Sequence, residues 1–131
     1  MTEQKHILVI DDDPDIVEAI KIVLESRNYR VSSAPDGSKG KELIESDRPD
    51  LIILDVMMRT IDEGFHVCYE LKNEERYKDI PILVSTAVAK TTGFDFDPRQ
   101  DEDWLPADDY VNKPVMPEDL LKRVERLIAG D

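Results

Sequence analysis

The sequence contains few cysteines and aromatic residues, and little positive charge. A single cysteine, Cys68, excludes a disulfide within the chain, as is usual for proteins of a reducing compartment. It follows Phe65 at helical spacing, which indicates a small core residue rather than a reactive thiol. Lys and Arg number 17 against 30 Asp and Glu, so the formal charge is −13. This charge argues against nucleic acid and against an anionic membrane as direct partners, since both repel an acidic protein.

Long apolar runs are also missing. The N-terminal sequence MTEQKHILVIDDD holds an apolar run too short for a signal peptide, and no stretch approaches the length of a transmembrane helix. We therefore expect a cytoplasmic protein without a membrane segment. A chain of 131 residues that is 40% hydrophobic fits one globular domain, expected over residues 1–131, with one sizeable core.

Short apolar runs alternate with amphipathic segments along the chain. Runs rich in β-branched residues predict buried strands, and residues spaced as on one helix face predict helices between them. Asp13 followed by Pro14 is typical of a helix N-terminus. Strands are expected over 6–11, 29–34, 50–55, 80–86 and 109–114, and helices from Pro14, over 38–46, over about 64–73 and from Pro117. This alternation predicts an α/β fold, a doubly wound five-stranded parallel sheet of flavodoxin-like order 2-1-3-4-5.

Acidic residues end two of the expected buried strands. Asp11 and Asp12 close the first strand, and Asp55 closes the third. In a doubly wound sheet the functional site lies beyond the carboxyl ends of the strands, where the winding reverses, so these three carboxylates should meet. Thr86 and Lys113 end the next two strands at the same edge. Carboxylate oxygens suit Mg²⁺, and a hydroxyl with a lysine opposite suits a transferred phosphoryl group.

These residues resemble those of the receiver domain of two-component response regulators, over essentially the whole chain. The motifs are the acidic pair Asp11-Asp12, Asp55 in DLIILDVMM, Thr86-Ala87 in PILVSTA and Lys113-Pro114 in ADDYVNKP. The resemblance implies that Asp55 accepts a phosphoryl group. It also implies that Asp11, Asp12, Asp55 and the backbone carbonyl of Met57 hold Mg²⁺.

The resemblance implies roles for the remaining site residues as well. Thr86 and Lys113 would bind the phosphoryl oxygens, and Tyr110 would reorient with Thr86 on activation. The bond between Lys113 and Pro114 is expected to be cis, which proline readily allows. The implied function is a phosphorylation-controlled switch that receives its phosphoryl group from a sensor histidine kinase or a histidine phosphotransfer protein. Such a domain catalyses only its own phosphotransfer and dephosphorylation, and signals to a downstream protein that the sequence does not name.

The sequence departs from the family pattern in two places. After Asp55 the usual proline-containing loop is replaced by MMRTIDEGF, with Arg59 at the proline position and one residue inserted before Gly64. Between Thr86 and Lys113 lie 26 residues, more than receivers usually have. Proline is costly inside a helix, and Pro98 and Pro106 with Gly93 interrupt this segment. We expect residues 89–107 to form an acidic loop, with at most a short helix over 98–105, in place of the fourth helix.

Two other functions fit parts of the pattern. Phosphatases of the haloacid-dehalogenase type also use an aspartyl nucleophile, but they place a second aspartate two residues later, where this chain has Met57. A pseudo-receiver that binds partners without phosphorylation remains open because of the altered loops. Residues 95–101 lack the glycine and the terminal glutamate of a calcium loop. His6 and His66 have no evident partner in the sequence.

We predict a long-lived phosphorylated form, because Met57 and Val88 are apolar. By the resemblance, the side chains two residues after the acceptor and two after Thr86 govern the attack of water on the phospho-aspartate. An apolar side chain cannot orient that water. The variant Met57→Asn should lose its phosphoryl group several-fold faster than the wild type in a decay assay without donor; an unchanged half-life would contradict this interpretation.

Overall fold

The computed structural model describes residues 4–55, 61–86, 108–112 and 116–129, with 61–66, Thr86, Tyr110 and Asn112 described by their backbone alone. The strands are β1 (His6–Ile10), β2 (Arg30–Ala34), β3 (Leu51–Asp55), β4 (Ile82–Thr86) and β5 (Asp109–Asn112). The helices are α1 (Pro14–Glu25), α2 (Gly37–Ser46), α3 (Ile61–Asn73) and α5 (Pro117–Ala129). Among these described helices, none is long and apolar enough to cross a membrane.

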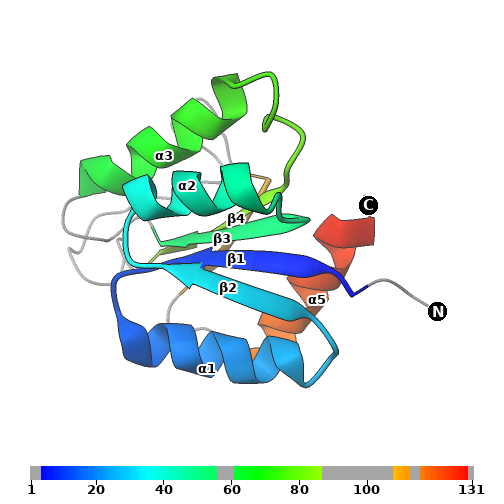
Figure 1. Ribbon diagram of the computed structural model, residues 1–131. Helices are drawn as coiled ribbons and strands as arrows, with labels where there is room; N and C mark the ends of the chain where they lie inside the picture. Colours follow the sequence, from blue (N-terminus) through cyan, green and yellow to red (C-terminus); the bar gives the residue numbers. More distant parts are fainter. Residues whose placement is uncertain (1–3, 56–60, 87–107, 113–115, 130–131) are drawn as a thin grey trace.

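The strands form one parallel sheet of order β2-β1-β3-β4-β5. Helices α2 and α3 cover one face of this sheet, and α1 and α5 cover the other (Figure 1). The predicted doubly wound α/β fold and its strand order are therefore confirmed. The expectation for residues 89–107 lies outside the described residues.

The core consists of two apolar layers, one on each side of the sheet. Side chains alternate along a strand, so β1 and β3 contribute apolar side chains to both layers. Each of these strands is buried along its whole length. Cys68 is fully buried in the layer below α2 and α3, and this burial raises the pKa of its thiol to about 12. Its predicted core role is confirmed. The edge strand β2 is partly exposed, which explains its weaker apolar pattern.

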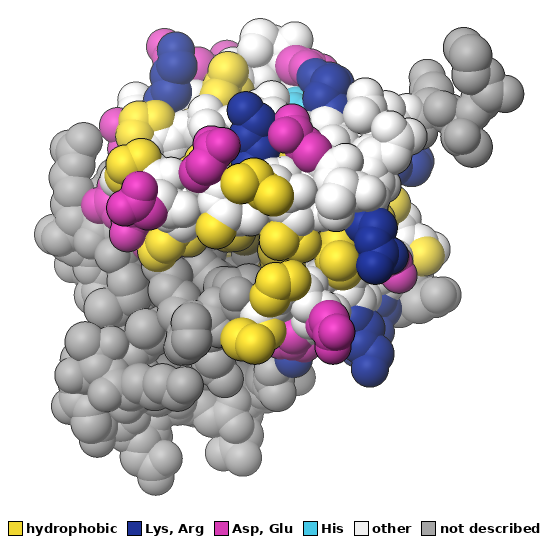
Figure 2. Space-filling view, turned by 90° about the horizontal axis from the view of Figure 1, so that it is seen from below, with side chains coloured by type: hydrophobic (Ala, Val, Ile, Leu, Met, Phe, Trp, Pro, Cys, Tyr) yellow, Lys and Arg dark blue, Asp and Glu magenta, His cyan; other side chains and the backbone are white. Residues whose placement is uncertain are grey.

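The surface on the side of α1 and α5 mixes apolar and charged side chains. Figure 2 shows the apolar ones interspersed with Lys, Arg, Asp and Glu. On this side Ile22 of α1 is 61% exposed, although most apolar residues of α1 and α5 pack inward. Helices α1 and α5 also contact each other directly, and together they cover the apolar layer on their side of the sheet.

Aspartate caps the first two helices. Asp13 accepts a hydrogen bond from the backbone N–H of Asp15 at 2.9 Å, and Pro14 is the first helical residue, as predicted. Asp36 likewise accepts from the backbone N–H of Lys39 at 2.9 Å, so α2 begins at Gly37. The sequence Pro-Asp-Gly, which is typical of a turn, therefore starts a helix here, because aspartate favours turns and N-caps alike.

The starts of α3 and β4 differ from the expected ones by two residues or more. Helix α3 begins at Ile61 rather than near residue 64, and the added turn reads Ile-Asp-Glu, whose acidic residues suit a helix N-terminus. Strand β4 begins at Ile82 rather than at residue 80, because the N–H of Ile80 closes a turn with the carbonyl of Tyr77 and Pro81 has no N–H to donate.

Lys72 connects α3 with the amino ends of β4 and β5. Its ammonium lies 2.6 Å from a carboxylate oxygen of Asp108 and donates to the carbonyl oxygen of Ile80 at 3.2 Å. The same oxygen of Asp108 accepts the backbone N–H of Ile82 at 2.8 Å. The side chain of Lys72 is 17% exposed and that of Asp108 is 38% exposed, so solvent screens this ion pair in part. It holds the amino ends of both strands under α3.

A second ion-pair group joins β5 to α5. Arg123 donates from Nη1 to Asp109 at 2.7 Å and from Nε to Asp119 at 2.9 Å, and it is 20% exposed. The two carboxylates raise the pKa of Arg123 against the opposing effect of burial. Helix α5 is thereby tied to the first residue of β5.

His6 is buried at the amino end of β1, although the sequence showed no partner for it. Its Nε2 lies 2.8 Å from the hydroxyl of Ser32, and its Nδ1, which has no hydrogen-bond partner among the described residues, lies 3.9 Å from Asp47. Burial lowers the pKa of His6 most, and Arg30 lowers it further, while Asp47 and Asp50 oppose this shift. Protonation of His6 is therefore less favourable in the folded protein than in the unfolded chain.

This environment predicts a pH-dependent contribution to stability. The unfolded chain binds a proton on His6 near the usual pKa of about 6.5, above the lowered pKa of the folded state. Stability therefore rises with pH between the two values and falls as the pH decreases through them. Between pH 7 and 5, the free energy of unfolding of the wild type should decrease more steeply than that of His6→Gln in urea titrations. The exposed control Lys5→Gln should keep the wild-type slope, and an equal slope in His6→Gln would disprove the assignment.

Candidate acidic phosphoacceptor site

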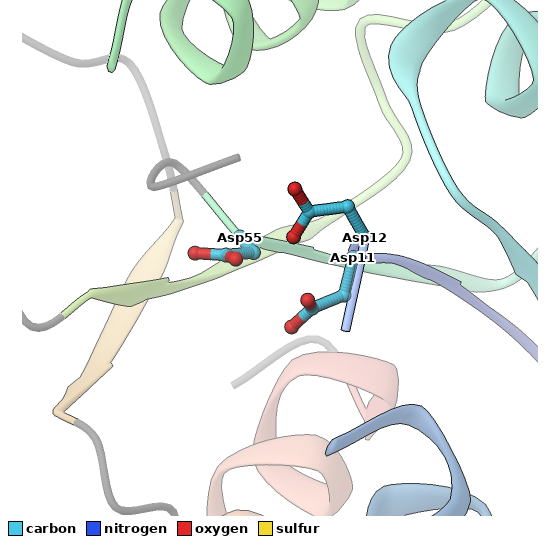
Figure 3. A group of neighbouring side chains, drawn as sticks. All are labelled: Asp11, Asp12 and Asp55. Atoms are coloured by element: carbon cyan, nitrogen blue, oxygen red, sulfur yellow. The ribbon is translucent and has the colours of Figure 1, made fainter. Parts of the chain in front are cut away.

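Three aspartates meet at the carboxyl edge of the sheet. Asp11 and Asp12 directly follow β1, and Asp55 is the last residue of β3. These two strands are parallel neighbours, with Ile10 opposite Leu54, so their carboxyl ends lie side by side. One carboxylate oxygen from each aspartate lies within 4.8 Å of the others (Figure 3). The predicted convergence of these side chains is confirmed.

The three carboxylates differ in their surroundings. Asp55 is 2% exposed and Asp11 is 4% exposed, whereas Asp12 faces solvent. The carboxylate of Asp11 accepts the backbone N–H of Asp13 at 2.9 Å, and the backbone N–H of Asp11 donates to Ala34 in the neighbouring strand at 3.0 Å. Asp11 is thus held beside the N-terminus of α1, where the helix dipole favours negative charge.

This arrangement fits a divalent cation. Two carboxylates at such separations repel each other by about 4 kcal/mol at an effective dielectric constant near 20. Burial of Asp11 and Asp55 removes most of the water that could screen them. Mg²⁺ prefers hard oxygen ligands and keeps several waters, and the exposed Asp12 leaves a solvent side for them. The donor set therefore suits Mg²⁺.

The other predicted site residues are only partly described. Thr86 is the last residue of β4, paired with Asn112, and Tyr110 lies in β5 opposite Val84. Their backbones thus belong to strands whose carboxyl ends share the edge with Asp55. Lys113, which follows β5, lies outside the described residues. So do Met57, Arg59 and the Lys113–Pro114 bond.

Sequence reasoning missed Ser85. This residue is 1% exposed and is the register partner of Asp55 in the adjacent strand. Its hydroxyl is buried and has no hydrogen-bond partner among the described residues. A buried polar group left unpaired costs about 1–3 kcal/mol. The available signal was a second hydroxyl residue, directly before Thr86, in the otherwise apolar strand ILVST.

Comparison with protein families matches residues 7–125 to the response regulator receiver domain. The chain belongs to this family. Among curated proteins, this receiver is 44% identical over 127 residues to the DNA-binding dual master transcriptional regulator RpaA of Synechocystis sp., covering 94% of this chain and 48% of that protein. The chain thus spans about half the length of the curated relatives it matches.

Solved structures agree with this assignment. A response regulator from Chloroflexus aurantiacus superposes with a TM-score of 0.84 at 29% identity, covering 97% of this chain and 99% of that one. The receiver domain of a sensor histidine kinase from Pseudomonas aeruginosa has a TM-score of 0.81 at 26% identity, covering 98% and 100%. That domain is described with a magnesium ion coordinated in its active-site cleft. The predicted membership of the receiver family is confirmed. The chain carries the three-aspartate pocket described above, and receivers of this family are typically switched by phosphorylation.

Binding of Mg²⁺ should stabilise the protein through this pocket. A ligand that binds only the folded state adds about 1.4 kcal/mol at ten times its dissociation constant. We expect the melting temperature of the wild type to rise with MgCl₂ and that of Asp12→Ala to stay nearly constant. The variant Asp15→Ala, which removes an exposed carboxylate one turn away, is the control and should respond like the wild type. An equal response of Asp12→Ala would place the metal site elsewhere.

Proposed function

We propose that this receiver is a phosphorylation-controlled switch of a two-component system, with Asp55 as the phosphoacceptor. The donor is the phospho-histidine of a sensor histidine kinase or of a histidine phosphotransfer protein. The observation that carries the proposal is the buried carboxylate of Asp55 at the end of a central strand, within 4.8 Å of the carboxylates of Asp11 and Asp12 (Figure 3).

The surroundings of the three aspartates support Asp55 as the nucleophile. Asp11 is engaged by the N–H of Asp13, and Asp12 is exposed. Asp55 lies between β1 on one side and β4 on the other, at the centre of the edge. A carboxylate oxygen of Asp55 attacks the phosphorus atom, the N–P bond of the phospho-histidine breaks, and its electron pair returns to the imidazole nitrogen. The product is an acyl phosphate on Asp55.

The other site residues complete the proposal. Asp11, Asp12, Asp55 and the backbone carbonyl of Met57 would hold Mg²⁺, which supplies positive charge opposite the phosphoryl oxygens. Thr86 and Lys113 would bind those oxygens. Magnesium in the cleft of the related receiver from Pseudomonas aeruginosa supports the choice of metal.

Phosphorylation would then change a partner-binding surface, with Thr86 and Tyr110 as the switch residues. We propose that the whole stretch 1–131 forms the receiver and that its downstream partner is a protein. The charge of −13 disfavours direct contact between this domain and nucleic acid, although the relative RpaA is named as DNA-binding. A cytoplasmic location fits the free, buried thiol of Cys68.

The decisive test is the site of modification. In Mg²⁺ with acetyl phosphate, the wild type should gain the mass of one phosphoryl group, and Asp55→Asn should gain none, because the amide cannot act as the nucleophile. The variant Asp79→Asn, at an exposed acidic position, should be modified like the wild type. An adduct that persists in Asp55→Asn would rule out Asp55 as the acceptor, and a wild type that forms none would favour a pseudo-receiver.

A further inference from the structure

Ser85 lies in a buried row that crosses the sheet at the functional edge. It is paired in register with Asp55 of β3 on one side and with Val111 of β5 on the other. Register partners in a parallel sheet carry their side chains on the same face, here the face covered by α1 and α5. Asp55, Ser85 and Val111 are 2%, 1% and 1% exposed. The side chain of Ser85 therefore lies on the same face as that of Asp55, one strand away and buried from bulk water.

The hydroxyl of Ser85 is a buried donor that reaches no acceptor within the described part of the chain in its present orientation. It is fully buried and makes no hydrogen bond among the described residues. Adjacent strands lie about 4.8 Å apart, so rotation about the Cα–Cβ bond of Ser85 can bring Oγ within hydrogen-bond distance of its neighbour. That neighbour is a carboxylate with about four acceptor sites, so it can accept from Ser85 in addition to its other interactions.

We propose that Ser85 is a positioning residue for phosphoryl transfer. Its Oγ–H donates to the carboxylate oxygen of Asp55 that does not attack, and so fixes the plane of the carboxylate. The other oxygen then attacks phosphorus, the bond from phosphorus to the leaving group breaks, and the leaving group takes the electron pair. A group held in the attack geometry reacts faster than one that rotates freely. This inference rests on the proposed role of Asp55.

Removal of the hydroxyl tests the proposal. With acetyl phosphate in saturating Mg²⁺, Ser85→Ala should lower the phosphorylation rate at saturating donor about tenfold, equivalent to about 1.4 kcal/mol in the barrier. The donor concentration at half-maximal rate should stay within about twofold of the wild-type value, because Ser85 does not touch the donor. Ser85→Thr, which keeps the hydroxyl, should restore the rate to within about twofold.

Two controls separate positioning from packing and from metal binding. Val111→Ala disturbs the same buried row on the other side of Ser85 without removing a hydroxyl, and should lower the melting temperature but leave the rate within about twofold. The rise in melting temperature with MgCl₂ should be the same in Ser85→Ala as in the wild type. Together, the rate of Val111→Ala and the Mg²⁺ response of Ser85→Ala test the positioning role even if Ser85→Thr is destabilised.

The outcomes distinguish this inference from the proposed function. A rate in Ser85→Ala within twofold of the wild type, or an equal slowing in Val111→Ala, would overturn the positioning role. Loss of the Mg²⁺ response in Ser85→Ala would assign Ser85 to the metal site and would also overturn it. A phosphoryl adduct that persists in Asp55→Asn would instead refute the acceptor itself.

Discussion

The carboxylates of Asp11 and Asp55 are buried at neighbouring strand ends, where they repel each other. The site depends on the fold holding these two groups close together despite their repulsion. The fully buried strands β1 and β3 supply the constraint, because neither can shift without exposing its apolar side chains. The backbone N–H of Asp13, at the N-terminus of α1, provides a partial positive charge for Asp11. The edge is thus preorganised for a cation before one binds.

Much of this arrangement could be predicted from the sequence because its signals are local. The apolar runs of β1 and β3 are continuous, as expected for strands covered on both faces, and each run leads into aspartate. Asp13 and Pro14 mark the start of α1 by their own backbone and side-chain chemistry. Once alternating strands and helices imply a doubly wound sheet, the convergence of the carboxylates follows from topology.

Features that depend on distant partners could not be predicted in this way. His6 contacts Ser32 from the neighbouring strand, and Lys72 reaches Asp108 across 36 positions of the chain. Neither pair has a motif, since each is created by the packing of elements. Ser85 is similar: its place beside Asp55 depends on the register between β3 and β4, and its hydroxyl, which has no hydrogen-bond partner among the described residues, is buried by the same packing. Such interactions become visible only when the strands are assembled.

The ion pair of Lys72 with Asp108 has a mechanical consequence. It clamps the amino ends of β4 and β5 under α3, and Arg123 ties α5 to the first residue of β5. The amino ends of β4 and β5 are therefore tied to each other and to helices on both faces, at the edge of the sheet opposite the acidic site. Loss of the Lys72 ammonium would loosen both strand ends together, because one carboxylate, that of Asp108, serves both strands.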